Sequence, residues 1–158
     1  MLTKLIADRK NIAKDFVAYM LDNEVSEIII SGSGTSYHAA LATRVFLENI
    51  LNIRIRAEYP LILKDSQRFY DDNNLLMAIS QGGQSQSTID VINMAHEAGI
   101  AIASISENKN ADVFMKADIK ILMEIGPELS VAKTKGYTGT VLILFILGLE
   151  AALELKKI

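Results

Sequence analysis

VSEIIISGSGTS, residues Val25–Ser36, holds a short apolar run that ends in two closely spaced glycines. The run Val25–Ser31 is typical of a buried strand, and the apolar spacing of Ser36–Leu51 after it predicts a helix. Asn74–Ser80, NLLMAIS, repeats the arrangement, because a glycine-rich turn follows it and a helix is predicted over Ser85–Ala98. The chain therefore contains two strand–glycine loop–helix units.

Further apolar patterns complete the prediction. Strands are predicted over Ile53–Glu58, Ile100–Ser106 and Asp118–Met123, helices over Asp8–Leu21 and Lys133–Lys156, and an irregular or short helical connection over Leu61–Phe69. Strands that alternate with helices pair in parallel through right-handed crossovers. We therefore expect an α/β fold: a three-layer αβα sandwich around a five-stranded parallel sheet of the doubly wound, flavodoxin-like type. Ligands of such sheets bind beyond the carboxyl ends of the strands, where the strand order reverses.

Length and composition narrow the class of protein. The 158 residues fit one domain, which we place over residues 1–158, and half of them are hydrophobic. The chain has no cysteine, which excludes disulfides and thiolate metal sites. A net charge of −3 without a basic tail disfavours nucleic acid as a partner. His38 and His96 are far apart without a carboxylate cluster, so we expect no metal and no cofactor.

No membrane partner is expected, although Val141–Leu149 is very apolar. Its nine residues are far fewer than the about 20 that a membrane span needs, so this segment is predicted to lie in the core or in a dimer interface. The N-terminal residues carry charge throughout, unlike a signal peptide. We therefore expect a cytoplasmic protein.

Two loops rich in glycine and hydroxyl groups are the candidate binding elements. In the first loop, Ser33, Gly34, Thr35 and Ser36 lie between a strand and a helix, where free N–H groups and the helix dipole favour an anion. The alternative is simple helix capping by one of these hydroxyls. Capping accounts for one hydroxyl and not for three beside two glycines.

The second loop has the same placement after another strand. Its nine residues, Ser80–Thr88, include no charged and no aliphatic residue, and they can offer neutral hydrogen bonds to a polar ligand. The candidate binding residues in this loop are Ser80, Gln81, Gly82, Gly83 and Ser85. If the two strands are neighbours, the loops face each other across one crevice.

A dinucleotide site is the competing interpretation. Gly32–Tyr37 begins like a Rossmann fingerprint, with Tyr37 where the third glycine belongs, and Glu58 could act as the ribose-binding acid. That interpretation leaves the second loop unexplained. A Walker-type loop is excluded, because no Gly-Lys-Ser/Thr follows either glycine loop.

A third segment, Gly126–Lys135, precedes the last helix. Glu128 is a weak candidate for a catalytic proton-transfer group, and Lys133 and Lys135 could meet an anionic ligand or be solvated. Val131 belongs to the same segment.

Three strings together resemble the sugar isomerase (SIS) domain family, and in particular the first SIS domain in the isomerase half of glutamine–fructose-6-phosphate amidotransferase. The strings are Gly34–Ala39, GTSYHA; Ser80–Ser85, SQGGQS; and Glu128–Lys135, ELSVAKTK. They have the order and spacing of the family, and the resemblance covers nearly the whole chain. It implies a dimerising αβα sandwich with a phosphosugar ligand.

The resemblance also implies roles for single residues. Ser36, Ser80, Gln81 and Ser85 fall at phosphate-binding positions, and Thr35, the backbone around Ser33, and Val131 fall near the sugar. Two positions depart from the family pattern: Gly82 stands where serine is usual, and Lys133 also replaces a serine.

The activity implied is that of a phosphosugar isomerase, an aminotransferase-like enzyme or a deglycase of amino-sugar metabolism. Enzymes of the glucosamine type carry two SIS domains in tandem, with the catalytic glutamate, histidine and lysine in the second, so none of these residues transfers to this chain. The chain is then one half of a tandem protein, a homodimer of single domains, or a domain that binds without catalysis. The alternative function is a non-catalytic sensor of sugar phosphates.

Overall fold

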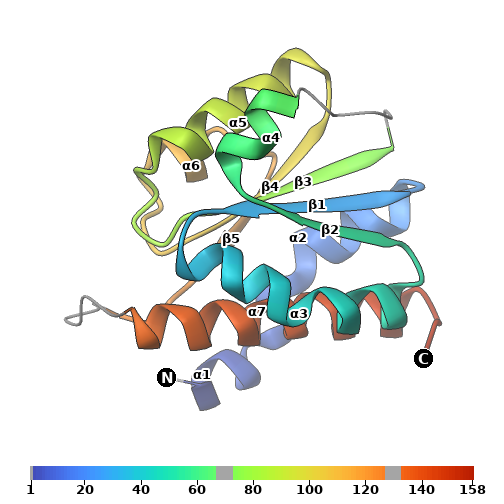
Figure 1. Ribbon diagram of the computed structural model, residues 1–158. Helices are drawn as coiled ribbons and strands as arrows, with labels where there is room; N and C mark the ends of the chain where they lie inside the picture. The colour runs from blue at the N-terminus through green and yellow to red at the C-terminus, as the bar shows by residue number, and fades with distance from the viewer. Residues whose placement is uncertain (1, 67–72, 127–132) are drawn as a thin grey trace.

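Five parallel strands form the centre of the molecule in the computed structural model, which describes residues 2–66, 73–126 and 133–158 (Figure 1). The strands are β1 (Glu27–Gly32), β2 (Arg54–Glu58), β3 (Asn74–Ile79), β4 (Ala101–Ser106) and β5 (Ile119–Leu122). Their order is β2-β1-β3-β4-β5, with parallel pairing at every step. This order confirms the flavodoxin-like prediction and puts the reversal of strand order between β1 and β3.

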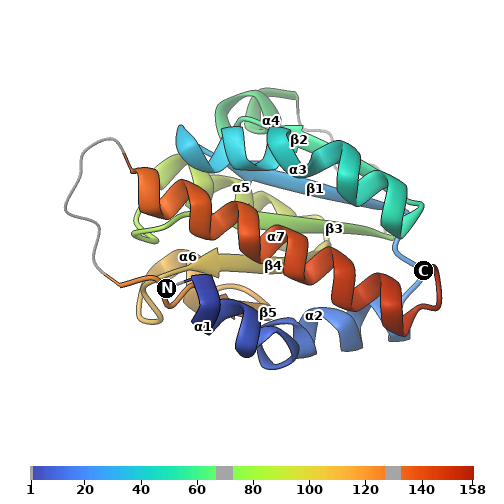
Figure 2. The same ribbon diagram turned by 90° about the horizontal axis from the view of Figure 1, so that it is seen from below.

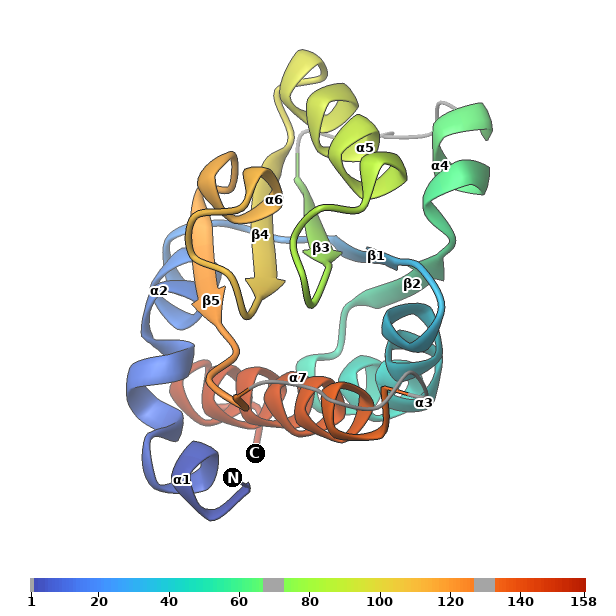
Figure 3. The same ribbon diagram turned by 90° about the vertical axis from the view of Figure 1, so that its left-hand side faces the viewer.

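Helices cover both faces of the sheet, which gives the three predicted layers (Figures 1 and 3). The helices are α1 (Leu2–Ala7), α2 (Arg9–Asp22), α3 (Thr35–Leu51), α4 (Pro60–Ser66), α5 (Gln86–Glu97), α6 (Asp112–Met115) and α7 (Thr134–Glu154). α1, α2, α3 and α7 lie on one side, and α4, α5 and α6 on the other. The sequence pattern missed the two shortest, α1 and α6, while the segment Leu61–Phe69 contains most of α4 and otherwise lies outside the described residues.

Alternation along the central strands builds two separate cores. Ile28 and Ile30 of β1 face the core beneath α2, α3 and α7, whereas Ile29 faces the core beneath α4 and α5. Every residue of β1 and of β3 is buried. Burial on both faces explains why these strands are continuous apolar runs rather than alternating ones.

The long apolar helix α7 packs closely against α3. A Cβ at Gly148 would overlap the Leu47 side chain and lie 3.0 Å from Ile50 Cδ1, so glycine permits this approach. Among the described residues α7 is the one helix long and apolar enough to cross a membrane, and 61% of its apolar window is buried in the fold. It is therefore a core helix, as its nine-residue apolar segment predicted.

Candidate functional site

The two predicted loops meet at the carboxyl ends of β1 and β3, where the strand order reverses. Together with the beginning of α7 they border a crevice of about 530 Å³. Eight predicted site residues line it: Ser33, Gly34, Thr35, Ser36, Ser80, Gln81, Gly82 and Ser85. Its other lining residues are Tyr59, Ile79 and Lys133. The structure thus brings the two loops together, as the neighbouring strands required.

Three predicted residues are not among the described lining residues, for two different reasons. Gly83 is buried behind the loop, while Glu128 and Val131 lie outside the described residues. Gly83 has φ 70°, and a Cβ there would overlap the Ala111 side chain and lie 3.0 Å from Ser106 Oγ. Its N–H donates to Ser80 O at 3.0 Å, which closes the turn. Gly83 therefore shapes the second loop.

Three helices begin at the crevice, α3, α5 and α7. The N-cap positions are Gly34 of α3, Ser85 of α5 and Lys133 of α7, and none has a side-chain capping hydrogen bond. The hydroxyls of the two loops are therefore not used for capping. First-turn N–H groups of α3 and α5, together with the positive ends of the three helix dipoles, make this edge of the sheet suited to an anion.

A chain of hydroxyl groups connects the two loops. Ser33 Oγ lies 3.4 Å from Ser87 Oγ, Ser87 Oγ lies 3.3 Å from Ser85 Oγ, and Thr88 Oγ1 donates to Ser85 Oγ at 3.0 Å. Ser87 is the link between the loops, and the sequence analysis did not name it as a site residue. The sequence did offer a signal for Ser87: it is a hydroxyl residue two positions after Ser85, at the start of α5.

The second loop is also held by hydrogen bonds to the end of β4 and by packing on α7. Gln81 O accepts from Glu107 N at 3.0 Å and from Ser106 Oγ at 3.3 Å, which ties the loop to the end of β4. The Gln81 amide lies where a Cβ of Gly136 would be, 2.5 to 2.9 Å away, so the loop also packs on α7. Gly82, in contrast, has no atom within 4 Å of its Cβ position and faces open space.

Among the crevice residues that the structure describes, Lys133 is the one with a charged side chain. Its backbone is left-handed, with φ 53°, and its side chain is exposed. Tyr59 closes the side near β2, and its ring packs edge-on against Tyr37 at 5.5 Å between centroids. Neutral donors, helix ends and one ammonium group together suit a phosphate or a similar anion.

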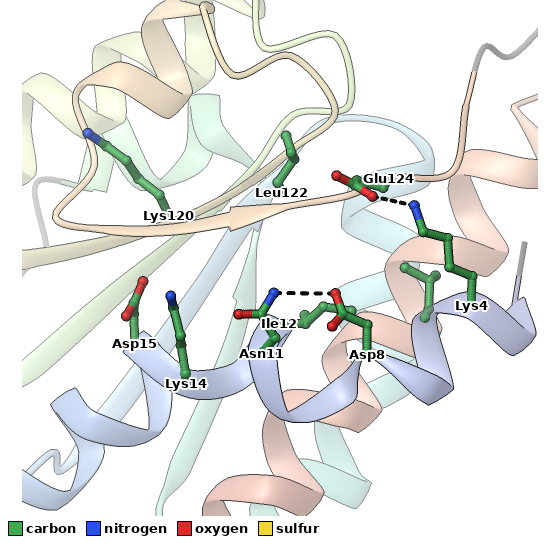
Figure 4. Close-up of a pocket in the computed structure, with 10 residues that line it drawn as sticks. Lys4, Asp8, Asn11, Ile12, Lys14, Asp15, Lys120, Leu122 and Glu124 are labelled. Carbon is green, nitrogen blue, oxygen red and sulfur yellow. Dashed lines mark hydrogen bonds and ion pairs between the residues drawn. The ribbon is translucent and has the colours of Figure 1, made fainter.

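A second hollow, of about 250 Å³, lies between α1–α2 and β5 (Figure 4). Its charged groups are of both signs and partly paired: Lys4 Nζ lies 2.6 Å from Glu124 Oε2, while Lys120, Lys14 and Asp15 line the other end. The hydrogen bond and the attraction to Glu124 raise the pKa of Lys4, and the same contacts lower the pKa of Glu124. Lys4 and Glu124 satisfy each other, and the three basic and three acidic side chains that line the hollow balance in charge, which leaves little net field for an ion.

The two histidines have separate surroundings. His96 contacts Lys116 O at 2.7 Å, and His38 is exposed beside the Tyr37 ring. In the described part of the chain, no three His, Asp or Glu side chains gather where they could hold a metal ion.

A family model and several known proteins resemble this chain in sequence. The SIS domain model matches residues 21–148. The glutamine–fructose-6-phosphate aminotransferase of Thermotoga maritima is 32% identical over 123 residues, which are 78% of this chain and 20% of that protein. The chain thus spans about a fifth of the length of this relative.

Solved structures agree on the fold. A candidate phosphosugar isomerase of Clostridium difficile 630 is 35% identical with a TM-score of 0.90, over 99% of this chain and 44% of that chain. A candidate sugar-binding protein of Salmonella typhimurium LT2 is 30% identical with a TM-score of 0.83, over 99% and 46%. The NanR protein of Vibrio vulnificus, complexed with ManNAc-6P, shares the fold at 19% identity with a TM-score of 0.77, over 93% and 56%. With a family model that matches most of its length, the chain belongs to the SIS domain family.

Proposed function

We propose that the crevice binds the phosphate group of a sugar phosphate. The observation that carries the proposal is the convergence of three helix N-termini on one crevice, two of which, those of α3 and α5, have no side-chain cap. A phosphate accepts hydrogen bonds from such N–H groups and is favoured by the helix dipoles. A neutral sugar alone would not use this field.

The residue roles follow from the loops. Ser36, Ser80, Gln81 and Ser85 bind the phosphate, while Thr35 and the backbone around Ser33 lie toward the sugar. These residues line the crevice together, which supports the assignment. Val131 at the sugar and Glu128 as a weak catalytic candidate stay proposals from the sequence, because both lie outside the described residues.

Lys133 and Gly82 adjust the same site. The Lys133 ammonium adds a positive charge at the start of α7, which favours a ligand with more negative charge than a neutral hydroxyl would. Because the space around Gly82 is open, a phosphate oxygen can approach its backbone closely. The backbone thus substitutes for a missing hydroxyl.

The activity we propose is that of one part of a phosphosugar isomerase or aminotransferase-like enzyme of amino-sugar metabolism in the cytoplasm, working with a second SIS unit. The relatives named as aminotransferases and isomerases favour this over a sensor. Aldose–ketose isomerisation moves a proton between C1 and C2 and needs a carboxylate or similar base. The described lining of the crevice holds no carboxylate, so the base comes from another part of the protein or from a partner.

A thermal-shift screen tests the ligand class. Glucosamine 6-phosphate, fructose 6-phosphate and ManNAc-6P should each be compared with its unphosphorylated sugar, with inorganic phosphate and with NAD. We expect stabilisation by at least one sugar phosphate and none by its unphosphorylated sugar. Stabilisation by NAD alone would show that the dinucleotide interpretation is correct.

A further inference from the structure

Lys133, which departs from the family pattern, is a poor match to its own local structure. It is the N-cap of α7, with φ 53° and ψ 36°. Left-handed backbone is uncommon for residues with a Cβ, and glycine or asparagine adopts it more readily. A positive charge at this end of α7 also opposes the helix dipole, which favours cations at the carboxyl end of a helix. Neither the backbone nor the helix therefore accounts for a lysine here.

The other end of the same helix provides a comparison. Lys156 has a similar backbone, with φ 55°. There the left-handed residue closes the helix, because Lys156 N donates to Leu153 O and Lys157 N donates to Ala152 O. Figure 2 shows that α7 begins at the same end of the molecule as α3 and finishes, near the C-terminus, at the opposite end. Helix termination and the helix dipole explain Lys156 and do not explain Lys133.

The Lys133 ammonium group has no partner among the residues that the structure describes. In contrast, the ammonium groups of Lys4 and Lys64 lie 2.6 and 2.7 Å from carboxylate oxygens. Lys135 does not line the crevice, and its Nζ lies 3.6 Å from the Cβ position of Gly126. Lys133 is thus the ammonium group that a ligand in the described crevice meets.

The residues proposed for the phosphate lie on other elements. Ser36 is in the first turn of α3, and the other three belong to the second loop, after β3. Between that loop and α7 lies the Gln81 amide, which packs against Gly136 one turn after Lys133. The crevice, at about 530 Å³, falls within the range of about 300–1,000 Å³ of pockets that hold whole small molecules, so a phosphate fills only part of it.

The donors of the crevice differ in the same way as their positions. Hydroxyls and the first-turn N–H groups of α3 and α5 are neutral donors, which suit the charge that a phosphate spreads over several oxygens. The Lys133 ammonium group is a point charge of one unit. It matches a carboxylate, which carries one negative charge, more closely than a second phosphate, which carries about two.

We propose that the ligand of the crevice is a sugar phosphate that also carries a carboxylate at the end remote from the phosphate, and that Lys133 binds this carboxylate. The inference rests on the proposed function and narrows its substrate class. A bound carboxylate offsets the positive charge that Lys133 adds at the start of α7. Lys133 selects the ligand and takes no part in proton transfer.

Calorimetry with two matched compounds tests the carboxylate. The compounds 6-phosphogluconate and sorbitol 6-phosphate differ only at C1, which is a carboxylate in the first and a hydroxymethyl group in the second. The wild type should bind 6-phosphogluconate about tenfold or more tightly than sorbitol 6-phosphate, as one hydrogen-bonded charge pair provides. Equal affinities would overturn the proposal and leave the proposed function in place. Binding of neither compound nor of any hexose 6-phosphate would instead contradict the proposed function itself.

Three variants test the role of Lys133. Lys133→Gly suits the left-handed backbone and should reduce the preference to less than about threefold, with little change for sorbitol 6-phosphate. Lys133→Arg should keep most of the preference. The matched control is Lys156→Gly, which makes the same change at a similar φ at the far end of α7 and should keep all of it. An equal loss for both compounds in Lys133→Gly would place Lys133 at the phosphate and overturn the proposal.

Two further measurements use the wild type alone and do not depend on the variants. The preference for 6-phosphogluconate should fall about threefold or more between about 50 mM and about 500 mM NaCl, because salt screens an exposed charge pair. The ratio of the two affinities cancels the effect of salt on the phosphate that both compounds share. A preference independent of salt, or tighter binding of fructose 1,6-bisphosphate than of 6-phosphogluconate, would contradict an ammonium–carboxylate pair.

Discussion

The crevice and the hollow beside β5 differ in how far their polar groups are already satisfied. In the hollow, Lys4 and Glu124 form an ion pair at 2.6 Å. In the crevice, α3 and α5 begin without a side-chain cap, and the hydroxyls of Ser33, Ser87 and Ser85 contact one another. A ligand must replace the partners that a group already has, so an uncapped helix end binds an anion at lower cost than a paired charge. The difference favours the crevice over the hollow as the proposed binding site.

Removing two hydroxyls should change the crevice most. Ser80→Ala combined with Ser85→Ala should weaken hexose 6-phosphate binding by about 2–4 kcal/mol, at roughly 1–2 kcal/mol for each lost hydrogen bond to a charged group. Isothermal titration calorimetry measures the loss. Ser66→Ala is the control, because that hydroxyl bonds to Leu63 O at the far end of α4. Unchanged affinity in the double variant would place the phosphate elsewhere.

The turn of the second loop should tolerate a side chain at one glycine and not at the next. Gly83→Ala should lower stability by about 2–3 kcal/mol, because alanine is strained at positive φ and its Cβ overlaps Ala111. Gly82→Ala, with open space at its Cβ, should leave stability nearly unchanged. Denaturant unfolding of both variants checks the contrast. Equal stabilities would show that the loop is not held as described.

The hydroxyl chain should matter less than the groups that contact the ligand. Ser87→Ala removes the link between Ser33 and Ser85, and we expect sugar-phosphate affinity to fall by about 0.5–1.5 kcal/mol, the contribution of a typical neutral hydrogen bond. Ser87→Thr keeps the hydroxyl and should retain most of the affinity. If both variants bind like wild type, Ser87 does not position the loops.

The ion pair beside β5 should have the smallest effect. Lys4→Met should leave sugar-phosphate affinity unchanged, and because both groups are exposed its effect on stability should be slight. The pKa of Glu124 is lowered, so its contribution to folding stability is present above its ordinary pKa and is lost as pH falls through the lowered pKa. The pKa of Lys4 is raised, so its contribution to folding stability is lost only as pH rises through the raised pKa.

Melting temperatures of the wild type and of Lys4→Met, measured across pH, test the pH dependence of the Lys4–Glu124 ion pair. The small difference between them should be present near neutral pH and vanish at both extremes. A large loss of ligand binding in Lys4→Met would instead assign the binding site to the hollow.

The sequence predicted the sheet and the two loops because both depend on local signals. The apolar runs of β1 and β3 and the glycines after them are contiguous in the chain. In contrast, α6 is only four residues long, too short for a periodic pattern, and α1 is separated from α2 by a single residue, Asp8. The pattern could not resolve either helix.

The parts of the site that sequence reasoning missed depend on tertiary contacts. Ser87 acts through its distance to Ser33, which is 54 residues away in the chain. Tyr59 lines the crevice because β2 lies beside β1. Gly83, a predicted binding residue, packs against Ser106 at the end of β4 and Ala111 before α6. Such packing has no local sequence signal.

An amide NMR titration with a hexose 6-phosphate tests the central claim most directly. The N–H groups at the starts of α3, α5 and α7, from Thr35, Gln86 and Thr134 onward, should shift together with one dissociation constant. The unphosphorylated sugar should leave them unchanged, and amides near Lys4 and Glu124 should not move with either compound. Shifts confined to the hollow beside β5, or equal responses to the two sugars, would contradict an anion site built from three helix ends.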